Sequence, residues 1–599
     1  MTSKNNPLSP ESMTELANQW VSLWTESSKT ITDYWQNTLP EFTNQDVPSI
    51  EQWHKMVQEM SELSVNSEAL GEAQLSLWQD TIRLWTTISN PESNEAAIAP
   101  AKDDRRFRSE RWNDGSMFDF IKQSYLLASR YVNNVTIAVD GMDDKKAEQL
   151  VFHTRQFMDA VSPSNFAMTN PDVINAAIES KGESLLNGFN NMVEDFKKGD
   201  GQLRISMTDA DAFELGKNIA TTPGKVVFEN DLMQLIQYES TTEKSFKRPL
   251  LIMPPWINKY YILDLQPENS LIKWLVSQGH SVFVISWVNP DASLADKGMD
   301  NYLLEGPVAA LDAIEQATGE NSVNVVGYCL GGTLLSALLA YNKAIGDERI
   351  KSATFLTSMI DFSEPGELGV YIDEQQLDDL DKKMDEQGYL DGADMAQSFN
   401  MLRSNDLIWS FVVNNYLMGR SPKAFDLLYW NSDSTRMPAR MHKEYLRNMY
   451  LNNCFKDAGG VTLNDVEIDV SSIETPTYFL STAEDHIAPW KSTYMGAALM
   501  SGSVKFVLGG SGHIAGVVNP EDSGKYGYWT RSGKLAETAD QWFESAKKNE
   551  GSWWSDWARW IKRHGGAGVE ARTPGDRELD VIEDAPGRYA SLRLDKPAR

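Results

Sequence analysis

Apolar residues recur at helical spacing through the first two hundred positions of the chain. Among them lie serine, asparagine and glutamate, and this pattern predicts amphipathic helices with wide aromatic faces. We therefore expect an aromatic-rich helical region at residues 1–103 and a helical domain at residues 104–215. The tryptophans serve either helix pairing or a docking face for a partner. The clearest positions are Leu16, Trp20, Leu23, Trp24, Trp78, Ile82 and Trp85.

From about residue 216, short apolar runs alternate with helical stretches. Such alternation is typical of an α/β domain with a largely parallel sheet. The runs are apolar almost throughout, as in strands buried on both faces. We expect a hairpin followed by six buried strands. The expected strands are residues 226–229, 235–239, 250–253, 282–287, 323–326, 353–357, 477–481 and 504–508.

A long insertion separates the strands expected at 353–357 and 477–481. It runs from about residue 361 to 470 and has a mostly helical pattern, so we expect a helical cap over the sheet. Its acidic stretch at 373–386 is better explained as a solvated helix face than as a binding site. Residues 216–599 are therefore expected to form one α/β domain with this cap inserted.

Composition limits the classes of partner. The 599 residues are 41% hydrophobic, and 55 Lys and Arg face 85 Asp and Glu, giving a net charge of −30 that argues against nucleic acid or an anionic membrane. The first residues lack an apolar signal segment, and no run is long enough to span a bilayer, so we expect a cytoplasmic protein that is not transmembrane. Only two cysteines occur, which excludes a disulfide framework and a multi-cysteine metal site. We expect neither a metal nor a cofactor.

The strongest local motif surrounds Cys329. The sequence Gly327-Tyr328-Cys329-Leu330-Gly331-Gly332 follows an expected strand and leads into a helical run. Strand, sharp turn and helix with flanking glycines indicate a nucleophile elbow, with Cys in the usual Ser position. The start of a helix favours the thiolate, and the backbone N–H of Leu330 would face a substrate oxyanion. An inert buried cysteine is the alternative interpretation.

An acid and a histidine follow in the order that this motif requires. Asp485 comes just after one expected strand, and His513 lies in a glycine-rich turn after the next. Nucleophile, acid and histidine in this order indicate an α/β-hydrolase type of triad, so we predict that Cys329, Asp485 and His513 act together. Glu484 is the rival carboxylate. His486 is the rival imidazole, although lining the site or supporting the loop suits it better.

The loop after the strand at 250–253 completes the expected site. In an α/β-hydrolase fold this loop supplies the second oxyanion N–H, which we assign to Ile257. Its tyrosines and Asp264 serve either packing or substrate contact. Cys454 has neither glycine turns nor an obvious base nearby, so we expect it to be unreactive.

Together these motifs resemble those of the poly(3-hydroxyalkanoate) synthases, and the length and undivided layout resemble class I. The resemblance covers roughly residues 104 to 589, while residues 1–100 share only a similar pattern of aromatic residues at helical spacing. It rests on residues 327–332, 254–265, 403–407, 430–435, 484–488, 511–516 and 551–554.

The resemblance implies an α/β-hydrolase-like catalytic domain with a cap, preceded by a helical domain. It implies an acyltransferase that polymerises (R)-3-hydroxyacyl-CoA, such as 3-hydroxybutyryl-CoA, and releases CoA. The implied partners are this substrate, the growing polyester chain, the surface of cytoplasmic polyhydroxyalkanoate granules, granule-associated proteins and a second copy of the chain in a homodimer. Substrate contacts are expected from Arg403, Asp264, His486 and Tyr328, with a salt bridge in the cap as the alternative for Arg403.

The chemistry of the residues agrees with this resemblance. A thiolate suits a thioester substrate, because the exchange is nearly isoenergetic and the acyl group stays activated. His513 would take the proton first from Cys329 and then from the attacking 3-hydroxyl, while Asp485 orients the imidazole. A thioesterase, esterase or polyester depolymerase on the same fold is an alternative, since fold does not fix reaction. A non-catalytic granule-coating protein is another, and it would make the triad a relic.

Overall fold

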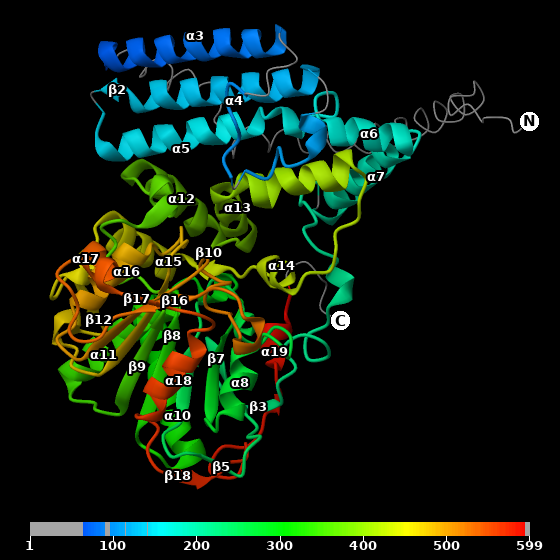
Figure 1. The fold of residues 1–599 in the computed structure, drawn as a ribbon. Helices are drawn as coiled ribbons and strands as arrows, with labels where there is room; N and C mark the ends of the chain where they lie inside the picture. Colours follow the sequence, from blue (N-terminus) through cyan, green and yellow to red (C-terminus); the bar gives the residue numbers. More distant parts are fainter. Residues whose placement is uncertain are drawn as a thin grey trace, which may run out of the picture. The chain divides into compact units, whose positions relative to one another are not determined.

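The computed structural model describes residues 64–89, 96–102, 104–113, 116–140, 142–199 and 201–593. The chain divides into two compact units (Figure 1). The first unit is Met1–Asp209 with Asn400–Lys423, and the second is Ala210–Phe399 with Ala424–Arg599. The helical pattern around Trp20 and Trp24 lies outside the described residues.

The first unit is helical, as predicted. Its three longest helices lie side by side (Figure 1). Helix α5 begins where the side chain of Asp143 accepts a hydrogen bond from the N–H of Lys146, and α6 begins after Asn170 with Pro171 at its first position. The elements are α3 (Ser67–Ser89), α4 (Ser116–Ile137), α5 (Asp144–Ala160), α6 (Pro171–Glu179) and α7 (Glu183–Lys198), with the short strands β1 (Ser64–Val65) and β2 (Val139–Asp140) paired antiparallel.

Helix α3 carries the tryptophans that the sequence analysis singled out. Leu84 is buried against Leu127 of α4, so this side of the helix pairs with its neighbour. Trp78 and Trp85 are 65% and 58% exposed, although the ring of Trp85 lies 5.6 Å from that of Phe120. Leu84 therefore serves helix pairing, whereas Trp78 and Trp85 are largely exposed, and a docking role for them stays a prediction.

The segment Asn400–Lys423, which the sequence analysis placed in the cap, packs with the first unit instead. It contains two π-helices, η9 (Asn405–Trp409) and η10 (Val412–Leu417). The hydroxyl of Tyr416 donates to Asp195 of α7 at 2.6 Å. A Cβ on Gly188 would overlap the carbonyl oxygen of Tyr416, so glycine permits this close approach. The predicted cap at 361–470 is corrected accordingly: helical periodicity gives no sign of the partner against which a helix packs.

The second unit is built on one large sheet. The six central strands are parallel, and antiparallel strands flank them on both sides. The order across the sheet is β17 (Lys547–Asn549), β16 (Tyr528–Thr530), β15 (Val504–Gly509), β14 (Thr477–Thr482), β9 (Ile350–Leu356), β8 (Val323–Tyr328), β6 (Leu250–Met253), β7 (Val282–Trp287), β4 (Met233–Tyr238), β3 (Gly224–Glu229) and β19 (Glu583–Asp584).

Each of the eight expected strands is present within three residues of its predicted ends. Strands β16, β17 and β19 were not predicted, because they are only two or three residues long, and β17 and β19 are also polar throughout. All three lie toward the edges of the sheet.

Helices cover both faces of this sheet. Along β6, Leu251 and Met253 face one core, whereas Leu250 and Ile252 face the other, as the period of two in a strand requires. Helices α10 (Ala309–Thr318) and α11 (Leu330–Ile345) pack into the first core, and α8 (Leu271–Ser277) and α18 (Trp554–Lys562) pack into the second. The unit is therefore a three-layer α/β domain, as predicted.

The remaining elements connect and cap the sheet. Helices α12 to α15 come from the inserted segment at 361–470, most of which belongs to this unit (Figure 1). None of the helices in the described part of the chain combines the length and the apolar character needed to cross a membrane. The elements that connect and cap the sheet are α9 (Met299–Leu303), η7 (Leu304–Val308), η8 (Gly366–Tyr371), α12 (Glu374–Gln387), β10 (Tyr389–Leu390), α13 (Gly392–Leu402), α14 (Asp426–Asn431), β11 (Met437–Pro438), α15 (Ala439–Tyr445), η11 (Leu446–Leu451), η12 (Cys454–Lys456), β12 (Val461–Leu463), β13 (Val466–Ile468), α16 (Trp490–Ala498), α17 (Ala539–Ser545), β5 (Lys244–Phe246), β18 (Gly568–Glu570) and α19 (Gly587–Ser591).

Candidate active site

Cys329 lies at the sharp turn between β8 and α11. Its φ of +52° and ψ of −122° are unusual for a residue with a side chain, and strain of this kind is typical of a nucleophile elbow. Its backbone N–H donates to the carbonyl of Leu356 in β9 at 2.9 Å, which ties the turn to the neighbouring strand. The thiol is half-buried and forms no disulfide.

The glycines around Cys329 allow this turn to pack closely. A Cβ on Gly331 would overlap the carbonyl oxygen of Met253, which ends β6. A Cβ on Gly332 would overlap the side chain of Ser358, and one on Gly327 would press into the backbone of Gly332 itself. The three glycines of the motif are thus required by sterics, and they let α11 begin directly against the strands.

His513 and Asp485 meet on loops that follow two neighbouring strands, β15 and β14. Nδ1 of His513 lies 2.7 Å from Oδ2 of Asp485, and both residues are buried. The other carboxylate oxygen of Asp485 accepts the backbone N–H groups of Ile487 and Ala488, each at 2.9 Å. Since these bonds fix the carboxylate, Asp485 can in turn fix the imidazole. The rival Glu484 is exposed.

Electrostatics favour a charged imidazole at this position. Burial lowers the pKa of His513, but the carboxylate of Asp485 and the sulfur of Cys329, which also hydrogen-bonds the ring, outweigh burial and raise the pKa well above its usual range. The ring of Tyr328 stacks on the imidazole, with centroids 5.8 Å apart. Burial raises the pKa of the Tyr328 hydroxyl well above its usual value, so it stays protonated. The imidazole of His513 can therefore accept a proton from Cys329 and hold it.

The loop after β6 is clamped on both sides of Ile257. The carbonyl of Trp256 accepts the hydroxyl of Thr435 at 2.9 Å, and Asn258 forms an antiparallel bridge with Ser434. The indole N–H of Trp287 donates to the carbonyl of Pro254 at 2.9 Å. These contacts hold the backbone near Ile257, where the second oxyanion N–H was expected.

A buried ion cluster explains why the motifs at 254–265 and 430–435 occur together. Nζ of Lys259 lies 3.6 Å from Asp433, and each side chain is only 1% exposed. Asp433 also accepts the hydroxyl of Tyr261 at 2.8 Å, while Lys259 donates to the carbonyl of Ala590 at 2.8 Å. The cluster joins the loop, the inserted segment and the end of the chain.

Two tryptophans of the motif at 551–554 support the loop that carries His513. The indole N–H of Trp553 donates to the carbonyl of Gly516, and that of Trp554 donates to the carbonyl of Val517, each at 3.0 Å. Both tryptophans are fully buried. They therefore anchor the backbone just beyond His513.

Cys329 opens onto an apolar cavity of about 160 Å³ in the second unit. Leu330 and Ile257, the two residues expected to supply the oxyanion N–H groups, also line it. Most other walls come from the inserted segment and are aliphatic or aromatic, and such walls exclude water. They include Phe362, Leu368, Tyr371, Ile372, Leu380, Leu390, Met395, Phe399, Leu446, Tyr445 and Tyr450.

Asp264 and His486 do not line this cavity. The carboxylate of Asp264 is buried and accepts hydrogen bonds from the hydroxyls of Thr222 and Ser270 at 2.5 and 2.6 Å. Burial raises the pKa of Asp264, and these two donors oppose the shift. Asp264 thus holds the loop rather than facing the cavity. His486 is half-buried, and its carbonyl accepts the N–H of Glu367, a support for the loop.

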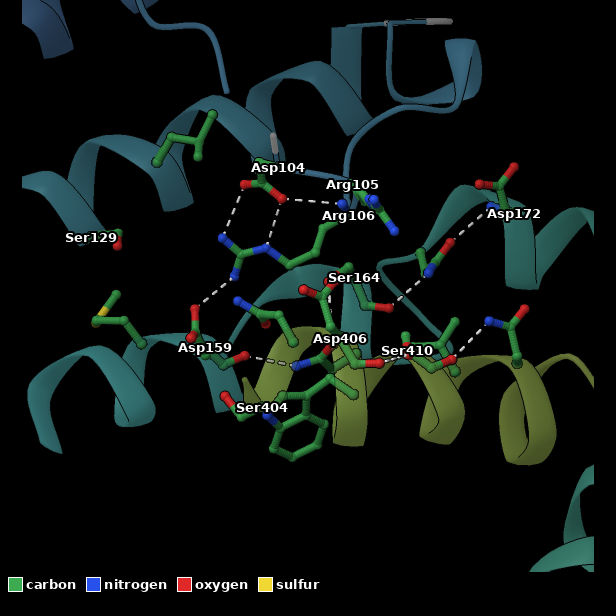
Figure 2. Close-up of a pocket in the computed structure, with 18 of the residues that line it drawn as sticks. Asp104, Arg105, Arg106, Ser129, Asp159, Ser164, Asp172, Ser404, Asp406 and Ser410 are labelled. Atoms are coloured by element: carbon green, nitrogen blue, oxygen red, sulfur yellow. Dashed lines mark hydrogen bonds and ion pairs between the residues drawn. The ribbon is translucent and has the colours of Figure 1, made fainter. Parts of the chain in front are cut away.

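Arg403 belongs to the first unit, where it lines a different cavity of about 1250 Å³. Its guanidinium lies 3.9 Å from Asp406, on the next turn of the same segment. In this cavity arginine and carboxylate side chains pair repeatedly: Arg106 contacts both Asp104 and Asp159, at 3.0 and 3.1 Å (Figure 2). Arg403 thus forms an ion pair with Asp406, but in the first unit and not in the cap, where the sequence analysis placed it.

Several polar residues of the cavity beside Cys329 were missed by the sequence analysis. Thr357 directly follows β9, and His442 and Tyr445 lie on α15. No motif marks them, because their position beside Cys329 depends on how the inserted segment folds over the sheet. The helical period of residues 439–445 was the only available signal.

Comparison with known proteins agrees with this geometry. Residues 103–275 match the family described as "Poly-beta-hydroxybutyrate polymerase (PhaC) N-terminus", and residues 249–520 match the α/β hydrolase fold. The second match confirms the predicted fold class.

Curated relatives match over most of their length. The poly(3-hydroxyalkanoate) polymerase of Methylorubrum extorquens is 44% identical, with 99% of this chain and 100% of that protein covered. The poly(3-hydroxyalkanoate) polymerase subunit PhaC of Rhizobium meliloti is 47% identical, with 87% and 85% covered. The corresponding subunit of Cupriavidus necator is 42% identical, with 88% of each chain covered. On these matches, the chain belongs to the poly(3-hydroxyalkanoate) polymerase family of acyltransferases.

Proposed function

We propose that this chain polymerises (R)-3-hydroxyacyl-CoA into a polyester, through an acyl intermediate on Cys329. The observation that carries the proposal is that Cys329, which opens onto an apolar cavity, interacts with His513, and that His513 is bonded to Asp485. Membership of a family of polymerases supports the same reaction. Each step below follows from the chemistry of these three side chains.

In the first half-reaction, the imidazole of His513 takes the thiol proton and the thiolate attacks the thioester carbonyl. A bond forms between the sulfur of Cys329 and the carbonyl carbon, and the bond to the sulfur of CoA breaks. The N–H groups of Leu330 and Ile257 stabilise the oxyanion. The proton held by His513 then passes to the CoA thiolate, which leaves as free CoA.

In the second half-reaction, a 3-hydroxyl attacks the acyl group. His513 accepts the hydroxyl proton, an ester bond forms at the carbonyl carbon, and the bond to Cys329 breaks. Asp485 stabilises the imidazolium in both steps. Water competes with the hydroxyl for the acyl group, and the apolar walls around Cys329 reduce that competition.

The cavity has room for a short acyl chain. A volume of about 160 Å³ accommodates a four-carbon hydroxyacyl group. We therefore propose (R)-3-hydroxybutyryl-CoA as a substrate, the surface of polyhydroxyalkanoate granules as the place of action and a homodimer as the assembly. The last two rest on the family resemblance.

One experiment separates this function from that of a hydrolase. The purified protein is incubated with (R)-3-hydroxybutyryl-CoA while thiol release and turbidity are followed together. A polymerase releases CoA with growing turbidity and yields an insoluble polyester. Release of CoA with free 3-hydroxybutyrate and no polymer would instead indicate a thioesterase, and no release would contradict both.

A further inference from the structure

Two buried polar atoms of residues that line the cavity beside Cys329 have neither a hydrogen bond nor an ion pair among the residues that the structure describes. They are the hydroxyl oxygen of Thr357 and Nδ1 of His442, on residues that are 0% and 1% exposed. Both residues line the same cavity as Cys329, and the triad uses neither. Since buried polar groups are normally paired, two unpaired atoms in one apolar cavity indicate a ligand that pairs with them.

The backbone of Thr357 gives independent support. Its φ is +46°, a conformation that β-branched residues rarely adopt. The N–H of Thr357 donates to the carbonyl of Leu480 in β14 at 2.7 Å, and the preceding residue, Leu356, accepts the N–H of Cys329. Thr357 is thus held between strands in a strained conformation at the edge that carries the nucleophile. Strain of this kind persists at functional sites, where the surroundings fix a side chain.

His442 contributes a neutral imidazole to the same cavity from a different element of the fold. It lies on α15, and burial lowers its pKa to about 4, so the ring is uncharged near neutral pH. A neutral imidazole has one nitrogen that donates and one that accepts a hydrogen bond. Its ring lies beside that of Tyr445, with the two ring centroids 6.3 Å apart.

The ligand that fits these features is an acyl chain with one oxygen substituent. A hydroxyl both donates and accepts, so it can accept from the Thr357 hydroxyl and donate to the imidazole of His442. We propose that Thr357 and His442 bind the C3 oxygen of the acyl chain, and that they select 3-hydroxyacyl thioesters over unsubstituted ones. This proposal rests on the proposed function, because it takes Cys329 as the residue that becomes acylated.

Selection follows from the cost of unpaired groups. An acyl chain without the hydroxyl would fill the cavity while leaving Thr357 and His442 buried and unpaired. A site built to bind a hydroxyl discriminates against such an analogue more strongly than an apolar pocket discriminates by size. Both residues therefore act as positioning residues for the substrate.

The test compares two thioesters in single-turnover acylation, followed by intact-protein mass spectrometry. The probes are (R)-3-hydroxybutyryl-CoA and butyryl-CoA, which lacks the hydroxyl. The variants come in matched pairs. Thr357→Val removes the hydroxyl and Thr357→Ser keeps it, while His442→Phe removes the ring nitrogens and His442→Asn keeps a polar atom at the δ position.

We expect Thr357→Val and His442→Phe each to lower the preference for the hydroxylated thioester about tenfold, which corresponds to one hydrogen bond. The rate with butyryl-CoA should stay the same or rise. Thr357→Ser and His442→Asn should keep most of the preference. This split between the two substrates is one that a merely structural role would not produce.

An unchanged preference in both Thr357→Val and His442→Phe would overturn the inference while leaving the proposed function intact. Equal loss of acylation with both thioesters, in folded protein, would also overturn it. If the unaltered protein is acylated by neither thioester, the proposed function fails and the inference fails with it. If Thr357→Val does not fold, the pair at His442 decides the question alone.

Discussion

Nδ1 of His513 lies 2.7 Å from Oδ2 of Asp485, although 28 residues separate them in the sequence. The two residues follow neighbouring parallel strands, whose carboxyl ends meet at one edge of the sheet. The same edge carries Cys329 after β8. The bond fixes which nitrogen of the imidazole faces the cysteine, and it therefore controls proton transfer.

Changing Asp485 to Asn should slow CoA release by roughly a hundredfold or more, because the amide no longer stabilises the imidazolium or fixes its tautomer. His513→Gln should be slower still. The initial rate of thiol release measures both effects. Glu484→Gln is the matched control and should keep most activity, because its carboxylate is exposed and makes no bond to His513. Asp485→Asn rates close to those of the unaltered protein would refute the role of this carboxylate.

Gly331→Ala should prevent the turn at Cys329, between β8 and α11, from adopting its observed conformation. The added Cβ would overlap the carbonyl oxygen of Met253, a backbone atom that cannot rotate away. We expect a loss of roughly 3 kcal/mol or more in the free energy of unfolding, together with lost activity. Gly568→Ala is the control, since nothing lies within 4 Å of its Cβ position. Equal thermal midpoints for the two variants would show that the turn has more room than the structure indicates.

Asp433→Asn should destabilise the protein strongly, because it leaves Lys259 buried without its carboxylate partner. Removing one member of a buried ion pair typically costs about 3–5 kcal/mol. Denaturant unfolding measures this loss. Asp379→Asn breaks an exposed pair with Lys382 and should change the free energy of unfolding little, because solvent screens the pair. A similar small effect at Asp433 would mean that the cluster does not hold the loop at 254–265.

His280 should make the protein less stable in mild acid. Burial lowers its pKa from the usual 6.5 to about 4, so the folded form keeps it neutral while the unfolded form binds a proton in that interval. Stability is thus fully present above about pH 6.5 and is lost as the pH falls toward about 4. His280→Leu should remove roughly 3 kcal/mol of this pH dependence, measured by urea unfolding across the interval.

The control for His280 is Phe246→Leu, which disturbs the same ring contact at 4.8 Å but removes no titrating group. It should lower stability equally at all pH values between 4 and 7. If the pH dependence of His280→Leu matches that of the unaltered protein, His280 does not carry the effect.

The central strands and the order of the triad residues could be predicted from the sequence. Buried parallel strands have a continuous apolar pattern, as in β6 and β7, and the glycines beside Cys329 mark a turn that few other structures need. Strand ends and glycine turns are local features, so they are visible in the sequence. The short polar strand β17 has no such pattern.

Other features depend on tertiary structure. Arg403 lies in the same helical sequence pattern as the cap residues, and contacts such as those of Tyr416 with Gly188 and Asp195 show that its segment packs with the first unit. Thr357 and His442 each combine an unpaired buried polar atom with a place in the wall of the cavity beside Cys329, and no sequence pattern records either feature. The carboxylate of Asp264 could contact a substrate by its chemistry alone, but in the structure it accepts a hydrogen bond from the hydroxyl of Thr222.

The acyl intermediate on Cys329 is the central claim, and mass spectrometry of the digested protein tests it most directly. The protein is mixed briefly with (R)-3-hydroxybutyryl-CoA, denatured in acid and digested. We expect a hydroxybutyryl group on the peptide that contains Cys329 in the unaltered protein and in Cys454→Ala, and none in Cys329→Ala. A hydroxybutyryl group on another residue, or undiminished CoA release by folded Cys329→Ala, would contradict the account.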